Sequence, residues 1–112
     1  MGRKNSKNDS LPGSLDMLIL KTLSRGALHG YAIVQFIQRT SGDEILIEEG
    51  SLYPALQRLE LNGWINGEWG LTPNKRNARI YRITARGRKQ LAHEQDRYKH
   101  LTLAIARVME ME

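Results

Sequence analysis

The sequence predicts a mainly α (α+β) fold, a winged helix-turn-helix followed by a C-terminal dimerisation helix. Three observations predict it: three short helical patterns come first, two extended segments then flank a turn-rich stretch, and a long helical pattern ends the chain. With 112 residues, of which 40% are hydrophobic, the chain can build one compact core and not two. The order of the elements carries this prediction, because each element alone is found in many folds.

The first predicted helix occupies residues 14–24. Its apolar residues recur at helical spacing and are Leu15, Leu18, Ile19 and Leu23. Ser14 can cap the amino end with Asp16 in the first turn, and Gly26 can end the helix.

A second helix is predicted over about residues 29–40, after a short link at residues 27–28. Ile33, Val34 and Ile37 form its inner stripe. Ser41 and Gly42 stop the helix, so residues 43–49 become a connector.

The third predicted helix is short and covers about residues 51–62. One apolar face is formed by Leu52, Ala55, Leu56 and Leu59. With Ser51 as the N-cap, Pro54 falls in the first turn, where a missing N–H has no cost. Asn62 and Gly63 then end the helix.

Residues 64–69 and 79–84 favour extended structure, and the intervening residues 70–78 are rich in turn formers. Together they predict a hairpin with a long basic tip. Thr84 can cap a final helix that runs to the end of the chain, roughly 27 residues or about 40 Å long. The predicted domains are a flexible basic arm at residues 1–12, a winged helix-turn-helix at residues 13–85, and the dimerisation helix at residues 86–112.

The charge balance favours a polyanionic partner, because 17 Lys and Arg against 12 Asp and Glu leave a net charge of +5. Residues 71–100 concentrate this charge, with nine basic and two acidic residues. The chain has no cysteine, so a disulfide or a thiolate metal site is excluded and a cytoplasmic protein is expected. Neither a secretory signal nor a membrane span is apparent, and no membrane partner is predicted.

The third predicted helix offers groups that can contact a DNA groove. Burial of its apolar face turns Tyr53, Pro54, Gln57 and Arg58 outward. Gln can bond adenine and Arg can bond guanine, while the helix start and the hydroxyls of Ser51 and Tyr53 suit phosphate oxygens. A solvated polar face is the alternative, but the position after a helix-turn-helix favours recognition.

The hairpin tip presents Lys75, Arg76 and Arg79, which suits a wing that reaches the phosphate backbone or the minor groove. A solubilising charged loop is the alternative. Near this cluster in the sequence, only Glu68 can neutralise it.

The final helix carries an apolar seam that predicts a homodimer. Leu91, Tyr98 and Ile105 repeat every seven residues, and Leu101 and Val108 fill the same seam. The alternative is that this helix docks on the chain's own core. A helix of about 40 Å projects beyond a small domain, so a partner helix is favoured. A two-fold dimer would also double the contacts on a pseudo-palindromic DNA site.

Two further groups leave alternatives open. Trp64 and Trp69 lie on opposite faces of one strand and can serve the core, the hairpin or the wall of a ligand pocket. His93, Asp96 and His100 share a helix face that could hold a metal with a second chain, but a solvated face is favoured. No nucleophile elbow, phosphate loop or paired carboxylates stand in a recognisable setting. The prediction is therefore a non-enzyme without metal, cofactor or catalytic residues.

The chain resembles the PadR family of transcriptional regulators at several runs of residues. These are Leu28-His29-Gly30-Tyr31-Ala32-Ile33, Glu49-Gly50-Ser51-Leu52-Tyr53-Pro54-Ala55-Leu56, Arg58-Leu59-Glu60, Gly63-Trp64-Ile65, Arg79-Ile80-Tyr81-Arg82-Ile83-Thr84 and Gly87-Arg88. The resemblance covers about residues 15–91. The whole is most similar to the short PadR-like regulators of acidobacteria.

This resemblance implies a homodimeric repressor joined through its C-terminal helix, with the third helix in the major groove of double-stranded DNA and the wing at the flanking minor groove. Carried over by position, it implies DNA contact by Ser51, Tyr53, Pro54, Gln57, Arg58, Lys75, Arg76, Arg79 and Tyr31. It also implies release of DNA by a small aromatic effector at the dimer centre.

A protein-interaction module on the same scaffold is the competing class, because a fold does not determine function. Charge placement separates the two: a continuous basic surface over the third helix and the wing favours DNA, whereas division of that surface by Glu48 and Glu49 favours a protein partner.

Overall fold

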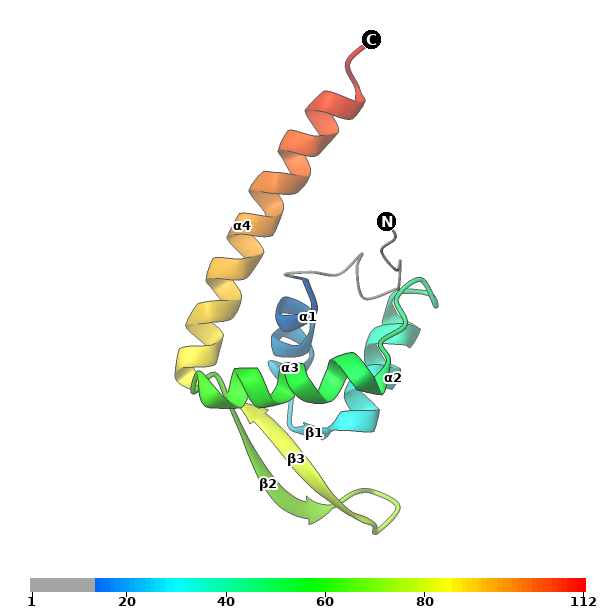
Figure 1. Ribbon diagram of the computed structural model, residues 1–112, viewed down its shortest axis with the longest axis vertical. Helices are drawn as coiled ribbons and strands as arrows, with labels where there is room; N and C mark the ends of the chain where they lie inside the picture. The colour runs from blue at the N-terminus through cyan, green and yellow to red at the C-terminus, as the bar shows by residue number, and fades with distance from the viewer. Residues whose placement is uncertain (1–13) are drawn as a thin grey trace.

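The computed structural model describes residues 14–112, and its elements follow one another as four helices and three strands (Figure 1). They are α1 (Ser14–Leu23), β1 (Leu28–His29), α2 (Gly30–Thr40), α3 (Glu49–Leu61), β2 (Ile65–Leu71), β3 (Asn77–Ile83) and α4 (Ala85–Met109). The mixed fold and the order of helices, hairpin and long helix are as predicted. The expected basic arm at residues 1–12 lies outside the described residues.

The core lies between the first three helices and the base of the sheet. Its fully buried large side chains are Ile19, Leu20, Leu23, Ile33, Leu52, Leu56, Leu59 and Ile65. The apolar stripe predicted for the third helix is confirmed, because Leu52, Ala55, Leu56 and Leu59 are all buried. Ile47 of the connector is buried as well and ties the segment before α3 to the core. The opposite face of α3 is thereby turned outward.

The start of α3 differs from the prediction, in which Ser51 was the N-cap. The helix begins at Glu49 with Glu48 as N-cap, and no side chain caps it. The N–H groups of Ser51 and Leu52 both donate to the carbonyl of Glu48, at 2.9 and 3.0 Å. Pro54 is therefore the sixth residue of the helix, where the carbonyl of Gly50 lacks its usual donor.

The sheet is antiparallel in the order β1-β3-β2. The two-residue strand β1 was not predicted, since Leu28 had been assigned to a link and His29 to the second helix. In this strand Leu28 pairs with Tyr81, and His29 pairs with Ile80. The hairpin register runs from Ile65 opposite Ile83 to Leu71 opposite Asn77. The tip is thus residues 72–76, shorter than the predicted 70–78, because the strands extend further on both sides.

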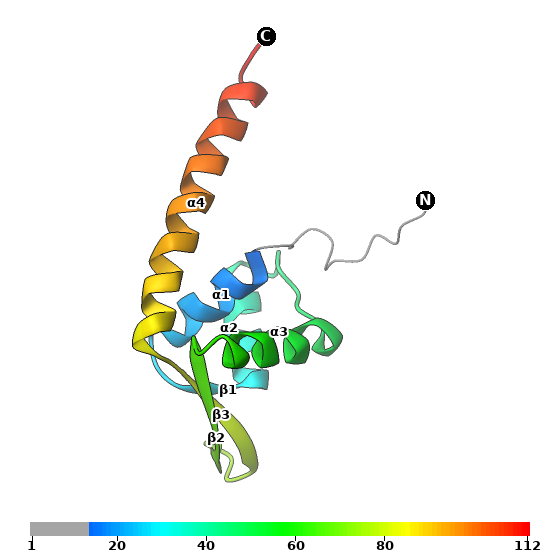
Figure 2. The same cartoon turned by 60° about the vertical axis from the view of Figure 1, so that its left-hand side comes forward.

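The long helix α4 begins as predicted and leaves the domain after its first turns (Figure 2). The Thr84 hydroxyl accepts from the Gly87 N–H at 3.0 Å and donates to the Gly63 carbonyl at 2.8 Å, which joins the helix start to the end of α3. Leu91 is buried in the chain's own core. The helix ends at Met109 rather than at the last residue.

Candidate nucleic-acid interface

The outward face of α3 carries the side chains that the sequence predicted for it. Tyr53, Pro54 and Gln57 are exposed, and Ser51 is half-buried. The Tyr53 ring lies over Gly30 at the start of α2: a Cβ placed on that glycine would stand 3.2 Å from the Tyr53 hydroxyl oxygen. Tyr31, the next residue of α2, is exposed. Tyr31 and Tyr53 therefore both lie where the start of α2 meets the outward face of α3.

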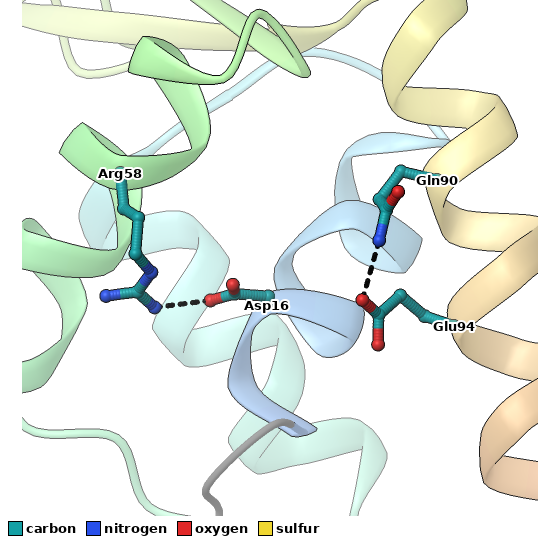
Figure 3. A network of polar contacts seen from close by, with 4 residues as sticks. All are labelled: Asp16, Arg58, Gln90 and Glu94. Atoms are coloured by element: carbon teal, nitrogen blue, oxygen red, sulfur yellow. Dashed lines mark hydrogen bonds and ion pairs between the residues drawn. The ribbon is translucent and has the colours of Figure 1, made fainter.

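Arg58 is exposed but not free of the fold. Its Nη2 donates to Oδ1 of Asp16 at 2.6 Å, so the guanidinium leans from α3 toward α1 (Figure 3). The side chain keeps 53% of its surface in solvent. An ion pair of this exposure contributes little to stability, but it fixes where the guanidinium lies.

Arg79 is not on the hairpin tip, which corrects the prediction. It lies within β3, and its Nη2 donates to Oε2 of Glu60 at 2.5 Å. The same carboxylate oxygen accepts from the Gly67 N–H of β2 at 3.1 Å. Glu60 therefore links the carboxyl end of α3 to both strands of the wing. Glu60 was not predicted to contact Arg79, because the two residues lie 19 positions apart in the chain.

Arg79, which Glu60 holds, also lies beside the buried side chain of Tyr81. The Arg79 guanidinium carbon lies 5.9 Å from the centre of the Tyr81 ring. Desolvation lowers the pKa of Arg79, but the hydrogen bonds and negative charges of Glu60 and Tyr81 together raise it above its ordinary value. Burial raises the pKa of the Tyr81 hydroxyl above its ordinary value of 10.0, contact with Arg79 lowers it, and the charge of Glu60 raises it again.

The wing tip presents Lys75 and Arg76 in solvent. The Thr72 N–H donates to the carbonyl of Arg76 and the Lys75 N–H donates to the carbonyl of Thr72, both at 2.8 Å. Lys75 has a φ of 62°, which turns the chain back toward β3. Both cations are held at the far end of the hairpin by backbone hydrogen bonds.

The charge on this side of the molecule is mixed. Glu48 and Glu49 are exposed at the amino end of α3, where the helix dipole stabilises them. Arg58 and Arg79 each face a carboxylate. Charge placement alone therefore leaves the choice between DNA and a protein partner open.

The projecting half of α4 exposes the predicted seam, apart from its first member. Tyr98, Leu101, Ile105 and Val108 are all exposed. Leu91 was assigned to the same seam, but its side chain is used in the core of its own chain. Where α4 passes α1, a groove of about 360 Å³ is lined by Met17, Leu18, Lys21, Gln95, Tyr98 and Lys99.

The two tryptophans have different surroundings. Trp64 packs partly buried against the core, whereas Trp69 in β2 is 72% exposed. Among the described residues 14–112, no group of three His, Cys, Asp or Glu side chains is arranged to hold a metal ion. His100 instead approaches the Asp96 carbonyl with Nδ1 at 2.9 Å. No helix in this part of the chain is long and apolar enough to cross a membrane.

Comparison with known proteins settles the class. Residues 19–93 match the family described as "Transcriptional regulator PadR-like family". The chain belongs to this family. An uncharacterized protein of Lysinibacillus sphaericus is 31% identical to this PadR-like chain over 86 residues, which cover 77% of the chain and 79% of that protein.

Solved structures of transcriptional regulators share the fold of this PadR-like chain. One from Clostridium thermocellum has a TM-score of 0.81 and 30% identity, covering 88% of this chain and 96% of its own. A PadR family regulator from Eggerthella lenta has a TM-score of 0.78 and 30% identity, covering 94% of this chain and 89% of its own. The winged helix is thus that of a DNA-binding transcriptional regulator.

Proposed function

We propose that this PadR-like regulator is a homodimeric, sequence-specific repressor that places α3 in the major groove of double-stranded DNA. The observation that supports this most is the exposed set Tyr53, Pro54 and Gln57 on α3, opposite a fully buried apolar stripe. A helix anchored in this way presents a rigid polar face of the size that a major groove admits.

Within that face, Gln57 is the side chain that can bond adenine through two hydrogen bonds. Ser51, Tyr53 and Tyr31 supply hydroxyls for phosphate oxygens, and Pro54 supplies an apolar contact. Arg58 takes part by exchanging Asp16 for an acceptor on DNA, because its guanidinium is held by that carboxylate in the free chain.

The wing contributes Lys75 and Arg76 at the backbone or the minor groove, while Glu60 and Arg79 hold the wing against α3. Two copies joined along Tyr98, Leu101, Ile105 and Val108 of α4 present two such units to a pseudo-palindromic operator.

We further propose that this chain is of the short acidobacterial type of PadR-like regulator and that a small aromatic effector releases it from DNA. The apolar groove between α1 and α4 supports this proposal, because Met17, Leu18 and Tyr98 line it beside the helix that joins the two copies. A ligand that binds there can alter the angle between the dimer helix and the DNA-binding domain.

The test is a gel-shift titration against the chain's own promoter region at several salt concentrations. Gln57→Ala should weaken specific binding by about 1–3 kcal/mol. Lys75→Ala should weaken all complexes similarly and lower the salt dependence by about one unit of slope. Lys89→Ala on α4 removes the same charge away from the hairpin tip and should do neither. Absence of a saturable complex that resists competitor DNA contradicts the proposal.

A further inference from the structure

One face of the wing carries two large apolar side chains in solvent. Trp69 is 72% exposed and Leu71 is 66% exposed, and both lie in β2. Directly paired residues of an antiparallel hairpin lie on the same face, so Trp69 shares its face with Arg79, and Leu71 shares it with Asn77.

This face is the one that meets α3. At the base of the hairpin it carries the buried residues Ile65 and Tyr81. One step further out, Arg79 reaches Glu60 of α3. Beyond that contact the same face continues toward the tip, which extends away from the helices (Figures 1 and 2). Trp69 and Leu71 therefore extend the recognition surface from α3 toward Lys75 and Arg76.

Packing among the described residues 14–112 does not explain these side chains. Trp64, directly before β2, is the tryptophan that contacts the core. A protein interface is also a poor explanation, because stable interfaces bury about 800 Å² on each partner and an aromatic side chain covers only about 150–250 Å². The cations at the tip, Lys75 and Arg76, attract a polyanion to the same end of the hairpin.

We propose that Trp69 and Leu71 pack against deoxyribose and the minor-groove edge of the DNA, next to the major groove that α3 enters. This inference rests on the proposed function. Sugar and base edges offer apolar surface between the phosphates, and minor-groove proteins place apolar side chains there. Lys75 and Arg76 bind the flanking phosphates, and the indole then covers the sugars between them. The wing thus contributes an apolar contact as well as an electrostatic one.

The experiment uses two proteins with one tryptophan each, since the chain has two. Trp64→Phe leaves Trp69 as the reporter, and Trp69→Phe leaves Trp64. On saturation with an operator fragment, Trp69 emission should change and its quenching by acrylamide should fall, while Trp64 should show neither effect. Should Trp64→Phe fail to fold, the difference between the native protein and Trp69→Phe supplies the same signal.

Affinity provides the second measurement. Trp69→Ala should weaken operator binding about tenfold, the order of loss expected when a large apolar side chain no longer buries its surface against the DNA. Its salt dependence should stay unchanged, because an indole releases no counterions, whereas Lys75→Ala should lower that dependence. Leu71→Ser should weaken binding in the same direction as Trp69→Ala, again without a change in salt dependence.

The outcomes separate this inference from the proposed function. If the protein with Trp69 alone forms the gel-shift complex, but its quenching is unchanged and Trp69→Ala binds like the native protein, the inference is overturned and DNA binding stands. If no complex forms, both are overturned. If Trp69→Ala changes the sedimenting mass without DNA, the face contacts a second copy of the chain and the inference is overturned.

Discussion

At the scale of single residues, Arg58 and Arg79 are each oriented by an acidic residue from another element. Asp16 of α1 holds Arg58, and Glu60 of α3 holds Arg79. Neither pair is visible in local spacing, because the partners lie 42 and 19 residues apart in the chain. Outward orientation could be predicted from the apolar stripe of α3, but the direction in which a long side chain leans is set by tertiary contacts.

Tyr81 gives this scale a pH prediction. Its pKa is raised in the folded protein above the ordinary value of 10.0, so the unfolded chain loses the proton first. The stabilising contribution is therefore complete below about pH 10 and is lost as the pH rises through the folded-state pKa. Tyr81→Phe should flatten the fall of the unfolding free energy in urea between about pH 9 and pH 11.

The control for this measurement is Tyr31→Phe, which removes a hydroxyl from an exposed tyrosine. Tyr31→Phe should show the same fall of the unfolding free energy with rising pH as the native protein. Equal slopes for the native protein and Tyr81→Phe would show that burial of this hydroxyl has no energetic consequence.

At the scale of elements, predictions succeeded where a signal lies within the element itself. The periodicity of α3 correctly predicted its buried stripe, and Thr84 caps α4 as its position before that helix indicated. The predicted start of α3 was wrong because Ser51 and Pro54 look like a cap and first turn, whereas the N–H groups of Ser51 and Leu52 donate to the Glu48 carbonyl and the helix begins at Glu49. Backbone hydrogen bonds, rather than a side-chain cap, form this helix start.

The sheet shows the same limit. β1 has only two residues, and its existence depends on pairing with β3, which local sequence does not report. The hairpin strands continue through residues with turn preference, such as Gly70 and Asn77, because the ladder between them adds hydrogen bonds. The shorter tip is why Arg79 lies in a strand rather than among the tip cations.

Gly87 supplies a prediction for the junction between wing and α4. A Cβ at this position would overlap the Trp64 carbonyl oxygen and lie 2.8 Å from Cγ1 of Ile83. Because the obstacle is backbone, it cannot move aside as a side chain can. Gly87→Ala should destabilise the fold by about 3 kcal/mol or more in urea unfolding.

Gly50→Ala is the matched control, since Gly50 also lies in a first helical turn but has open space where its Cβ would stand. It should stabilise the protein by up to about 1 kcal/mol through helix propensity. Similar destabilisation by both changes would indicate that helix geometry, and not the contact with Trp64, makes glycine necessary at position 87.

At the scale of the whole molecule, α4 belongs to two environments. Its first turns are anchored by Gly87 and Leu91, and the rest projects from the domain (Figure 1). A helix as long as the projecting part of α4 is only marginally stable in water when it has no packing partner. Apolar side chains along its exposed half therefore support the proposed dimer, in which the same contact would set the spacing of the two α3 helices on DNA.

Two side chains of nearly equal exposure allow this to be tested. Ile105 is 51% exposed and lies on the predicted seam, whereas Leu103 is 52% exposed and lies about 200° away around the helix axis. Ile105→Glu should convert a dimer to a monomer in sedimentation equilibrium and weaken operator binding at least tenfold, about the loss expected when the two half-sites are no longer bound together. Leu103→Glu adds the same charge and should leave both unchanged. If Leu103→Glu instead dissociates the dimer and Ile105→Glu does not, the seam lies on the opposite face of α4, and the two recognition helices are presented to DNA in a different relative orientation.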